Sequence, residues 1–161
     1  MGSGTTFING DTLMARITPC LENGTTAYVD FLSDGMVGWG STEYIVMRPK
    51  NGIPTSFGYF IARLDSFRQL AIQSMTGTSG RQRANTNALK ALPWIKFPTE
   101  IIQAFDTIGG ATLEQAKSRG DQNKILSQLR DALLPKLLSG EIRTDAEQDG
   151  KPFLIEIKII S

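Results

Sequence analysis

Three residues in the middle of the chain, Arg81, Gln82 and Arg83, carry side chains that can read the edges of DNA bases. A guanidinium can donate two hydrogen bonds to guanine, and a glutamine amide can bond to adenine in the same way. Residues 76–80, just before them, are small, and their hydroxyl and amide groups can hold phosphates. The alternative is a structural loop whose two glycines only permit a tight turn. The first candidate DNA-binding site is therefore Thr78, Ser79, Gly80, Arg81, Gln82 and Arg83.

A second candidate lies closer to the N-terminus, where Arg16 and Thr18 stand at the end of an expected strand. The pair Asn23-Gly24 follows, and it readily adopts the positive φ angles of a hairpin tip. From such a tip, Asn23 could reach a groove of DNA. A turn without a ligand is the simpler interpretation, because Asn and Gly favour turns for purely conformational reasons.

Charge supports an anion-binding face only in one part of the chain. The 161 residues carry 17 Lys and Arg against 16 Asp and Glu, so the net charge is +1. Residues 63–96, in contrast, hold six cations and the single acid Asp65. Such a segment is either a face that binds anions or an ordinary hydrated surface. Within it, Lys90 and Lys96 are candidate phosphate contacts, although an exposed lysine is usually only hydrated.

Composition excludes several kinds of catalysis. The chain has no histidine, so it contains no Ser-His-Asp triad, no Cys-His pair and no His-ligated zinc. A single cysteine, Cys20, allows neither an internal disulfide nor a thiolate cluster. Nucleotide-binding glycine motifs and the Asn-Pro-Pro-aromatic motif of amino-methyltransferases are absent from the sequence. Asp149, Glu156 and Lys158 superficially resemble a metal-dependent nuclease, but that site needs central strands of a nuclease core, which we do not expect here.

Hydropathy predicts a protein without a membrane span. Hydrophobic residues make up 40% of the chain and charged residues 20%, and no run of about 18 apolar residues occurs. The first residues lack the basic and apolar regions of a secretory leader. We therefore expect the protein in the cytoplasm.

The first hundred residues are expected to form short strands and short helices. Alternating or β-branched runs between turn signals predict strands over 11–17, 25–32, 41–48 and, between two prolines, 93–98. Glycines predict loops at 34–35 and 38–40. Helices are expected to begin at a capping residue in each of three pairs: Thr55 or Ser56, Asp65 or Ser66, and Asn85 or Thr86.

After Pro98 the pattern becomes that of a long helix, with Gly109-Gly110 as a candidate interruption. A helix over 111–134 would extend about 36 Å, too far to bury its length against a domain of about a hundred residues. A coiled coil with a partner is therefore expected, and packing on its own domain is the alternative. Pro135 should kink or end the helix. The apolar stripe for a partner helix consists of Ile125, Leu126, Leu129, Leu133 and Leu137.

Three segments together resemble the specificity subunits of type I restriction-modification systems. They are NGDTLMARITPCLENG at 9–24, QSMTGTSGRQR at 73–83 and QLRDALLPKLLSGEI at 128–142. Asn85-Thr86 and Leu92-Pro93 follow the second segment at the expected places. Each segment alone is moderately specific, and the resemblance rests on their order and spacing over about 9–143.

The resemblance implies a non-catalytic protein. A complete subunit of this family has two target-recognition domains, each reading one half of a split DNA site and each followed by a long helix. The two helices pair antiparallel as a ruler and dock methyltransferase subunits, while catalysis resides in the partner subunits. This chain resembles one such half, and it starts late, because the family has further strands before the segment matching Gly10-Asp11.

The sequence thus predicts an α+β protein in three parts. Residues 1–99 would form a truncated recognition domain with a small mixed β-sheet, 100–143 a helical spacer that forms a coiled coil, and 144–161 a tail. We expect binding to double-stranded DNA and to a type I methyltransferase subunit, a homodimer through the long helix, and no cofactor, metal or membrane. Three alternatives stay open: an interaction module that docks the modification subunit or another specificity subunit without binding DNA, a decayed fragment, and the nuclease.

Overall fold

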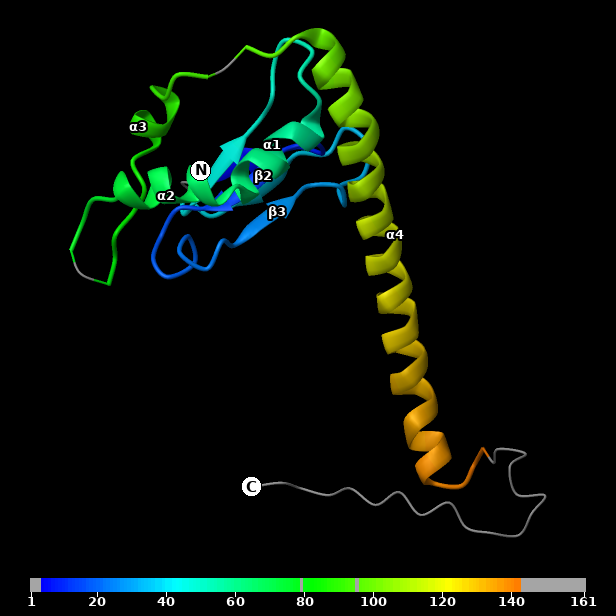
Figure 1. The fold of residues 1–161 in the computed structure, drawn as a ribbon. Coiled ribbons are helices and arrows are strands. Elements are labelled where there is room, and N and C mark those ends of the chain that lie inside the picture. Colours follow the sequence, from blue (N-terminus) through cyan, green and yellow to red (C-terminus); the bar gives the residue numbers. More distant parts are fainter. Residues whose placement is uncertain (1–3, 79, 95, 143–161) are drawn as a thin grey trace. The chain divides into compact units, whose positions relative to one another are not determined.

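A computed structural model describes residues 4–78, 80–94 and 96–142 (Figure 1). Short strands come first, short helices follow, and a long helix ends the described part, which confirms the α+β class. The strands are β1 (Thr5–Phe7), β2 (Thr12–Ala15), β3 (Thr26–Tyr28), β4 (Gly38–Gly40) and β5 (Tyr44–Met47). The helices are α1 (Thr55–Arg63), α2 (Asp65–Gln73), α3 (Thr86–Lys90) and α4 (Thr99–Leu138).

The strands form two small antiparallel sheets, whereas the sequence predicted one mixed sheet. Strand β2 is the centre of the larger sheet, with β3 on one side and β5 on the other. In this register Leu13 lies opposite Ala27 and Val46. The strands predicted over 11–17, 25–32 and 41–48 are therefore present, although each is shorter than expected.

The second sheet pairs β1 with β4 and corrects the expected loop at 38–40. Phe7 of β1 lies against the two glycines of β4, and a Cβ added at Gly38 would stand only 2.2 Å from the Phe7 ring. The glycines are thus required by a close approach of the two strands, a known use of glycine in sheets. Glycine has little strand propensity, so the pattern itself did not predict β4.

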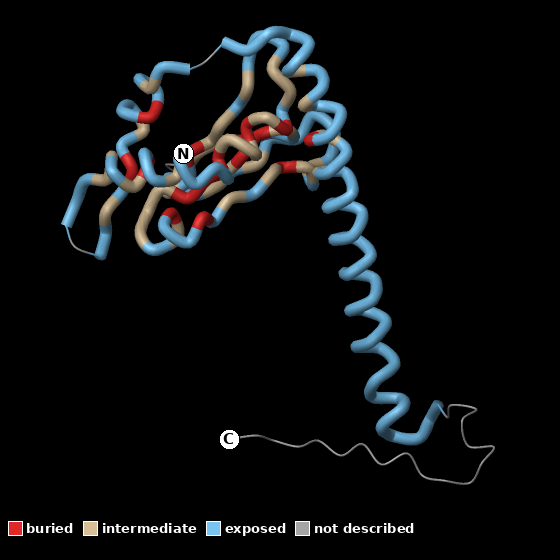
Figure 2. Tube along the Cα trace, in the orientation of Figure 1, coloured by how far each residue is buried: buried red, intermediate tan, exposed pale blue. Residues whose placement is uncertain are grey.

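The core joins the larger sheet to the short helices (Figure 2). Met14 of β2 is 1% exposed, and Ile45 of β5 is buried beside it in the same cluster. Leu21 joins the cluster from the turn after β2, and α1 and α2 contribute Ala62, Phe67 and Ala71. Leu89 of α3 and Ala84, which precedes the Asn85 cap, complete it. This cluster fixes the segments that carry the candidate DNA-binding residues, because Leu21 and Ala84 lie next to them in the chain.

Two of the three expected helix caps are wrong. Helix α1 begins after Pro54 and α2 after Leu64, without a side-chain cap in either case. The hydroxyls near the start of α1 have tertiary partners: Thr55 bonds to the Tyr28 hydroxyl at 2.7 Å. The third cap is confirmed, since the Asn85 side chain accepts hydrogen bonds from two backbone N–H groups of α3.

Helix α4 is longer than the predicted 111–134 and passes through Gly109-Gly110 without interruption. It also continues three residues beyond Pro135 before it ends at Leu138. Gly140, with φ of 75°, follows the helix end, where a glycine readily adopts a positive φ angle. The strand predicted over 93–98 is absent from the described residues of that range. The prolines at its two ends lack the backbone N–H groups that a strand donates to its neighbours, which accounts for the absence of a strand.

The chain divides into two compact units after Lys117, and α4 contributes to both. In the first unit, Phe105 of α4 packs edge-to-face on Phe57 and Phe60 of α1, with ring centroids 5.4 Å apart in each pair. Ser56 Oγ donates to Asp106 at 2.9 Å, and Lys117 Nζ donates to the Asp30 carbonyl at 2.6 Å. In contrast, every residue from 114 to 142 is exposed.

Candidate nucleic-acid interface

The first candidate segment is a narrow hairpin. Thr76 and Arg83 exchange two backbone hydrogen bonds, of 3.0 and 2.9 Å. Between them, Gly77 and Gly80 have positive φ angles, and the Arg81 N–H donates to the Thr78 carbonyl at 3.0 Å. Ser79 lies outside the described residues. The glycines therefore do serve a tight turn, and that turn presents exposed Thr78, Gly80 and Arg81 near its tip.

The hairpin is attached to the second candidate segment. Ile17 and Arg83 form an antiparallel bridge, and the Thr18 N–H donates to the Gln82 carbonyl at 3.1 Å. The Ala84 N–H donates to the Arg16 carbonyl at 2.8 Å. Two segments more than fifty residues apart in the sequence thus lie side by side. The fold therefore brings Arg16, Thr18, Gln82 and Arg83 together, as a shared site requires.

Residues 17–24 form helical turns instead of a two-residue hairpin tip. The N–H groups of Leu21 and Asn23 donate to carbonyls four residues earlier, each at 3.0 Å. Gly24 ends the turns with φ of 69°, and a Cβ there would stand 2.7 Å from Arg68 Nη1. Asn23 is exposed, as a groove contact requires. Arg68 is thereby placed next to this turn, which the sequence did not predict.

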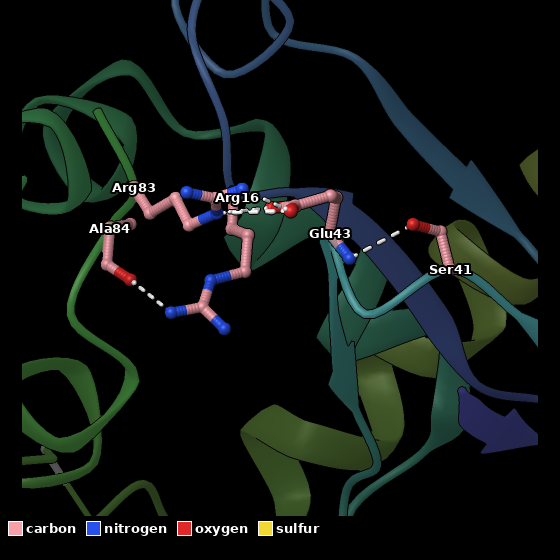
Figure 3. A network of polar contacts seen from close by, with 5 residues as sticks. All are labelled: Arg16, Ser41, Glu43, Arg83 and Ala84. Atoms are coloured by element: carbon pink, nitrogen blue, oxygen red, sulfur yellow. Dashed lines mark hydrogen bonds and ion pairs between the residues drawn. The ribbon is translucent and has the colours of Figure 1, made fainter. Parts of the chain in front are cut away.

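An acid that the sequence interpretation missed lies at the base of the hairpin. Arg83 donates from Nε to both carboxylate oxygens of Glu43, at 2.9 and 2.8 Å, and from Nη2 to Oε1 at 2.6 Å (Figure 3). The nearby Arg16 guanidinium donates to the Ala84 carbonyl at 3.2 Å. Hydrogen bonding to Arg83, together with the positive charges of Arg83 and Arg16, lowers the pKa of Glu43. The same pair raises the pKa of Arg83, which stays a cation at any ordinary pH.

The signal for Glu43 was its position just before β5. Residues Ala15 and Tyr44 are paired across β2 and β5, and the Arg16 N–H continues the ladder to the Glu43 carbonyl at 3.0 Å. Glu43 directly precedes β5, and β5 pairs with β2. Glu43 therefore lies beside the end of β2 at which Arg16 stands. Only the strand register reveals this, because Glu43 and Arg83 are forty residues apart.

The basic segment carries less free charge than its composition indicates. Two of its six cations have carboxylate partners: Arg83 with Glu43, and Arg68 with Asp65 at 2.7 Å. In the described part of the chain, no carboxylate lies within 4 Å of the other four, which are Arg63, Arg81, Lys90 and Lys96. All four are exposed. Lys90 ends α3 and Lys96 precedes α4, so neither belongs to the hairpin.

The predicted partner stripe is exposed on the second unit. Its exposed fractions run from 63% at Ile125 to 37% at Leu133. Leu126, Leu129 and Leu137 lie between these values, and Leu134 and Leu138 add further exposed apolar surface. Large exposed apolar patches mark interaction surfaces, so this stripe is a candidate for one.

The described residues contain no cluster of three or more Cys, Asp or Glu that could hold a metal. Nor do they include a helix with the length and hydropathy needed to cross a membrane. The nuclease-like residues Asp149, Glu156 and Lys158, and the whole predicted tail 144–161, lie outside the described part.

Fold and site define a small α+β protein with a basic hairpin and a long helix with an exposed apolar stripe. No family model matches the chain, and no solved structure matches it significantly. It is 34% identical over 102 residues to the specificity subunit of the type I restriction enzyme EcoEI of Escherichia coli. It is also 38% identical over 81 residues to the specificity subunit of EcoAI, again from Escherichia coli.

The chain is thus similar in sequence to two type I restriction enzyme specificity subunits, which confirms the resemblance found in the sequence. The matched residues are 62% of this chain and 17% of the EcoEI subunit, and 49% of this chain and 13% of the EcoAI subunit. The matched part of the chain thus spans less than a fifth of the length of either relative.

Proposed function

We propose that this chain is a non-catalytic DNA-recognition piece of a type I restriction system. It would bind double-stranded DNA through the hairpin and place a methyltransferase subunit, and with it the restriction subunit, at a split site in the cytoplasm. The observation that carries the proposal is the junction of residues 16–18 with the hairpin 76–83. It gathers the two candidate segments in a protein whose relatives are specificity subunits.

The contacts give the residues of the interface different roles. Arg81 is exposed near the hairpin tip and has no carboxylate partner among the described residues, so it is free to bond to guanine. Gln82 is half-buried and holds Thr18 through its carbonyl, which leaves its side-chain amide as the reading group. Asn23 would reach a groove, and Thr78, Lys90 and Lys96 would contact phosphates, which set affinity more than sequence preference.

The number of unpaired cations in 63–96 sets how much this segment can add to the salt dependence of DNA binding. Each phosphate neutralised by a protein cation contributes about −0.9 to the slope of log K against log salt concentration. If all six cations of 63–96 contacted phosphates, the slope would approach about −5. If only the four unpaired cations of this segment contacted phosphates, its contribution would fall to about −3.6.

The proposal is tested by fluorescence anisotropy with mixed-sequence duplex DNA at several salt concentrations. We expect salt-sensitive binding, and a slope shallower by about 0.9 in Lys90→Ala, because Lys90 is a proposed phosphate contact. Lys50→Ala is the matched control, because Lys50 is an exposed cation of the connection between β5 and α1 and lies outside the candidate segments. Absence of binding by the folded protein at low salt contradicts the proposal.

A second candidate function rests on a separate observation, the exposed stripe on α4. A chain that does not bind DNA could still use this stripe to dock the methyltransferase subunit or another specificity subunit. Binding to such a protein in the absence of any affinity for DNA would favour this interaction module over the recognition function.

A further inference from the structure

Glu43 is an acid in the middle of a surface proposed to bind a polyanion. Its carboxylate accepts three hydrogen bonds from Arg83, and its side chain is only 28% exposed. Its backbone is held as well: the carbonyl accepts from the Arg16 N–H at 3.0 Å, and the N–H donates to Ser41 Oγ at 3.1 Å. The backbone of Glu43 is therefore held beside β2, and its carboxylate is held by Arg83.

This arrangement restrains Arg83. A guanidinium presents five N–H donors on three nitrogens, and Arg83 directs two of those nitrogens to Glu43. Arg83 cannot bind a phosphate or a guanine with the same pair of nitrogens unless it first leaves the carboxylate. The negative charge of Glu43 also repels any phosphate that comes close to Arg83 or to the neighbouring Arg16.

We propose that Glu43 is a specificity-determining residue, which suppresses sequence-independent DNA binding by keeping Arg83 from the phosphate backbone. This inference rests on the proposed DNA-recognition function. Specificity is the difference between the free energies of binding to the correct and to the wrong sequences, and weakening the phosphate term reduces the binding that all sequences share. Base reading is then left to Gln82 and to Arg81, the hairpin cation without a carboxylate partner among the described residues.

The test compares Glu43→Gln with the wild-type protein on mixed-sequence duplex DNA over a range of salt concentrations. Release of Arg83 for one additional phosphate should steepen the salt slope by about 0.9 and tighten binding at low salt. Glu22→Gln is the matched control: Glu22 is an exposed acid of the adjoining 17–24 turn, and it has no ion pair within the described residues. It removes the same charge, frees no arginine and should leave the slope unchanged.

Two further variants separate this role from a structural one. In Glu43→Gln/Arg83→Gln the additional slope should disappear, because the released guanidinium is gone. A glutamine at position 43 could still accept a hydrogen bond from Arg83, whereas an alanine could not. Glu43→Ala should therefore also steepen the slope. An acid that only clamped the hairpin would, when replaced, lower the melting temperature and weaken DNA binding without a steeper slope.

The outcomes distinguish this inference from the function on which it rests. If the wild-type protein binds DNA and Glu43→Gln has an unchanged or shallower slope, the inference is overturned and the proposed function stands. The same holds if the double variant retains the steeper slope, since Arg83 is then not the group released. If neither the wild type nor Glu43→Gln binds DNA at low salt, the proposed function and the inference both fail.

Discussion

Gly109 of α4 lies so close to Phe60 of α1 that a Cβ added at Gly109 would stand 3.1 Å from a ring carbon of Phe60. The same Cβ would be 3.0 Å from the ring of Phe105. Since Phe105 also packs edge-to-face on Phe57 and Phe60, this glycine stands at the centre of the aromatic contact that holds the start of α4 to α1. Within the first unit, Gly109 therefore serves a close approach and is not a break in the helix.

We expect Gly109→Val to destabilise the first unit by about 1–3 kcal/mol, the usual cost of forcing extra carbon atoms into a packed contact. Gly120→Val is the matched control, because Gly120 belongs to the same helix but has no atom within 4 Å of an added Cβ. Valine also has a better helix propensity than glycine, so the control should not lower stability. Urea unfolding measures both changes, and equal midpoints for the two variants would refute this role of Gly109.

The ion pair of Glu43 and Arg83 makes a second prediction, about pH. Glu43 has a folded-state pKa below its ordinary value of 4.5 because it accepts hydrogen bonds from Arg83. Its contribution to stability is therefore fully present above the unfolded-state pKa and is lost as the pH falls through the lowered folded-state value. The difference in melting temperature between wild type and Glu43→Gln should be constant above about pH 5.5 and shrink below pH 4.5.

Thermal unfolding followed by circular dichroism from pH 3 to 7 measures this difference. Asp34→Asn serves as the control, because Asp34 is an exposed acid with no ion pair among the described residues. Its difference from the wild type should stay near zero throughout the range. A Glu43→Gln difference that grows as the solution becomes more acidic would contradict a lowered pKa.

Much of this fold could be predicted from local sequence patterns. The alternation over 11–17 and the β-branched run over 41–48 predicted β2 and β5, because a half-buried strand repeats every two residues. The Asn85 cap and the long helix after Pro98 were also correct. These features depend on interactions between residues close in sequence, so a pattern within one segment contains the necessary information.

The features that were missed depend on distant partners. Strand β4 exists because Phe7 fits against two glycines, and Thr55 is no helix cap because its hydroxyl bonds to Tyr28. Glu43 belongs to the candidate site only through the pairing of β2 with β5. The free positive charge of residues 63–96 was therefore overestimated, because Glu43, which pairs with Arg83, lies outside this segment in the sequence.

The third prediction concerns the partner of α4. The stripe Ile125, Leu126, Leu129, Leu133 and Leu137 is exposed in the single chain, and we propose that it pairs antiparallel with a second copy. Burying one leucine side chain contributes about 1.5–3 kcal/mol, so a charge at two stripe positions should weaken self-association at least tenfold. We expect a dimer mass for the wild type at tens of micromolar and a monomer mass for Leu129→Glu/Leu133→Glu.

Light scattering during gel filtration measures both masses. The control is Gln128→Glu, which adds one of the same charges beside the stripe, at an exposed position that belongs to no expected apolar contact. It should remain a dimer, since a charge outside the seam of a helix pair is still hydrated. A wild-type protein that is strictly monomeric at these concentrations would contradict the predicted homodimer. The stripe would then be left to a different partner, of which the methyltransferase subunit is the first to test.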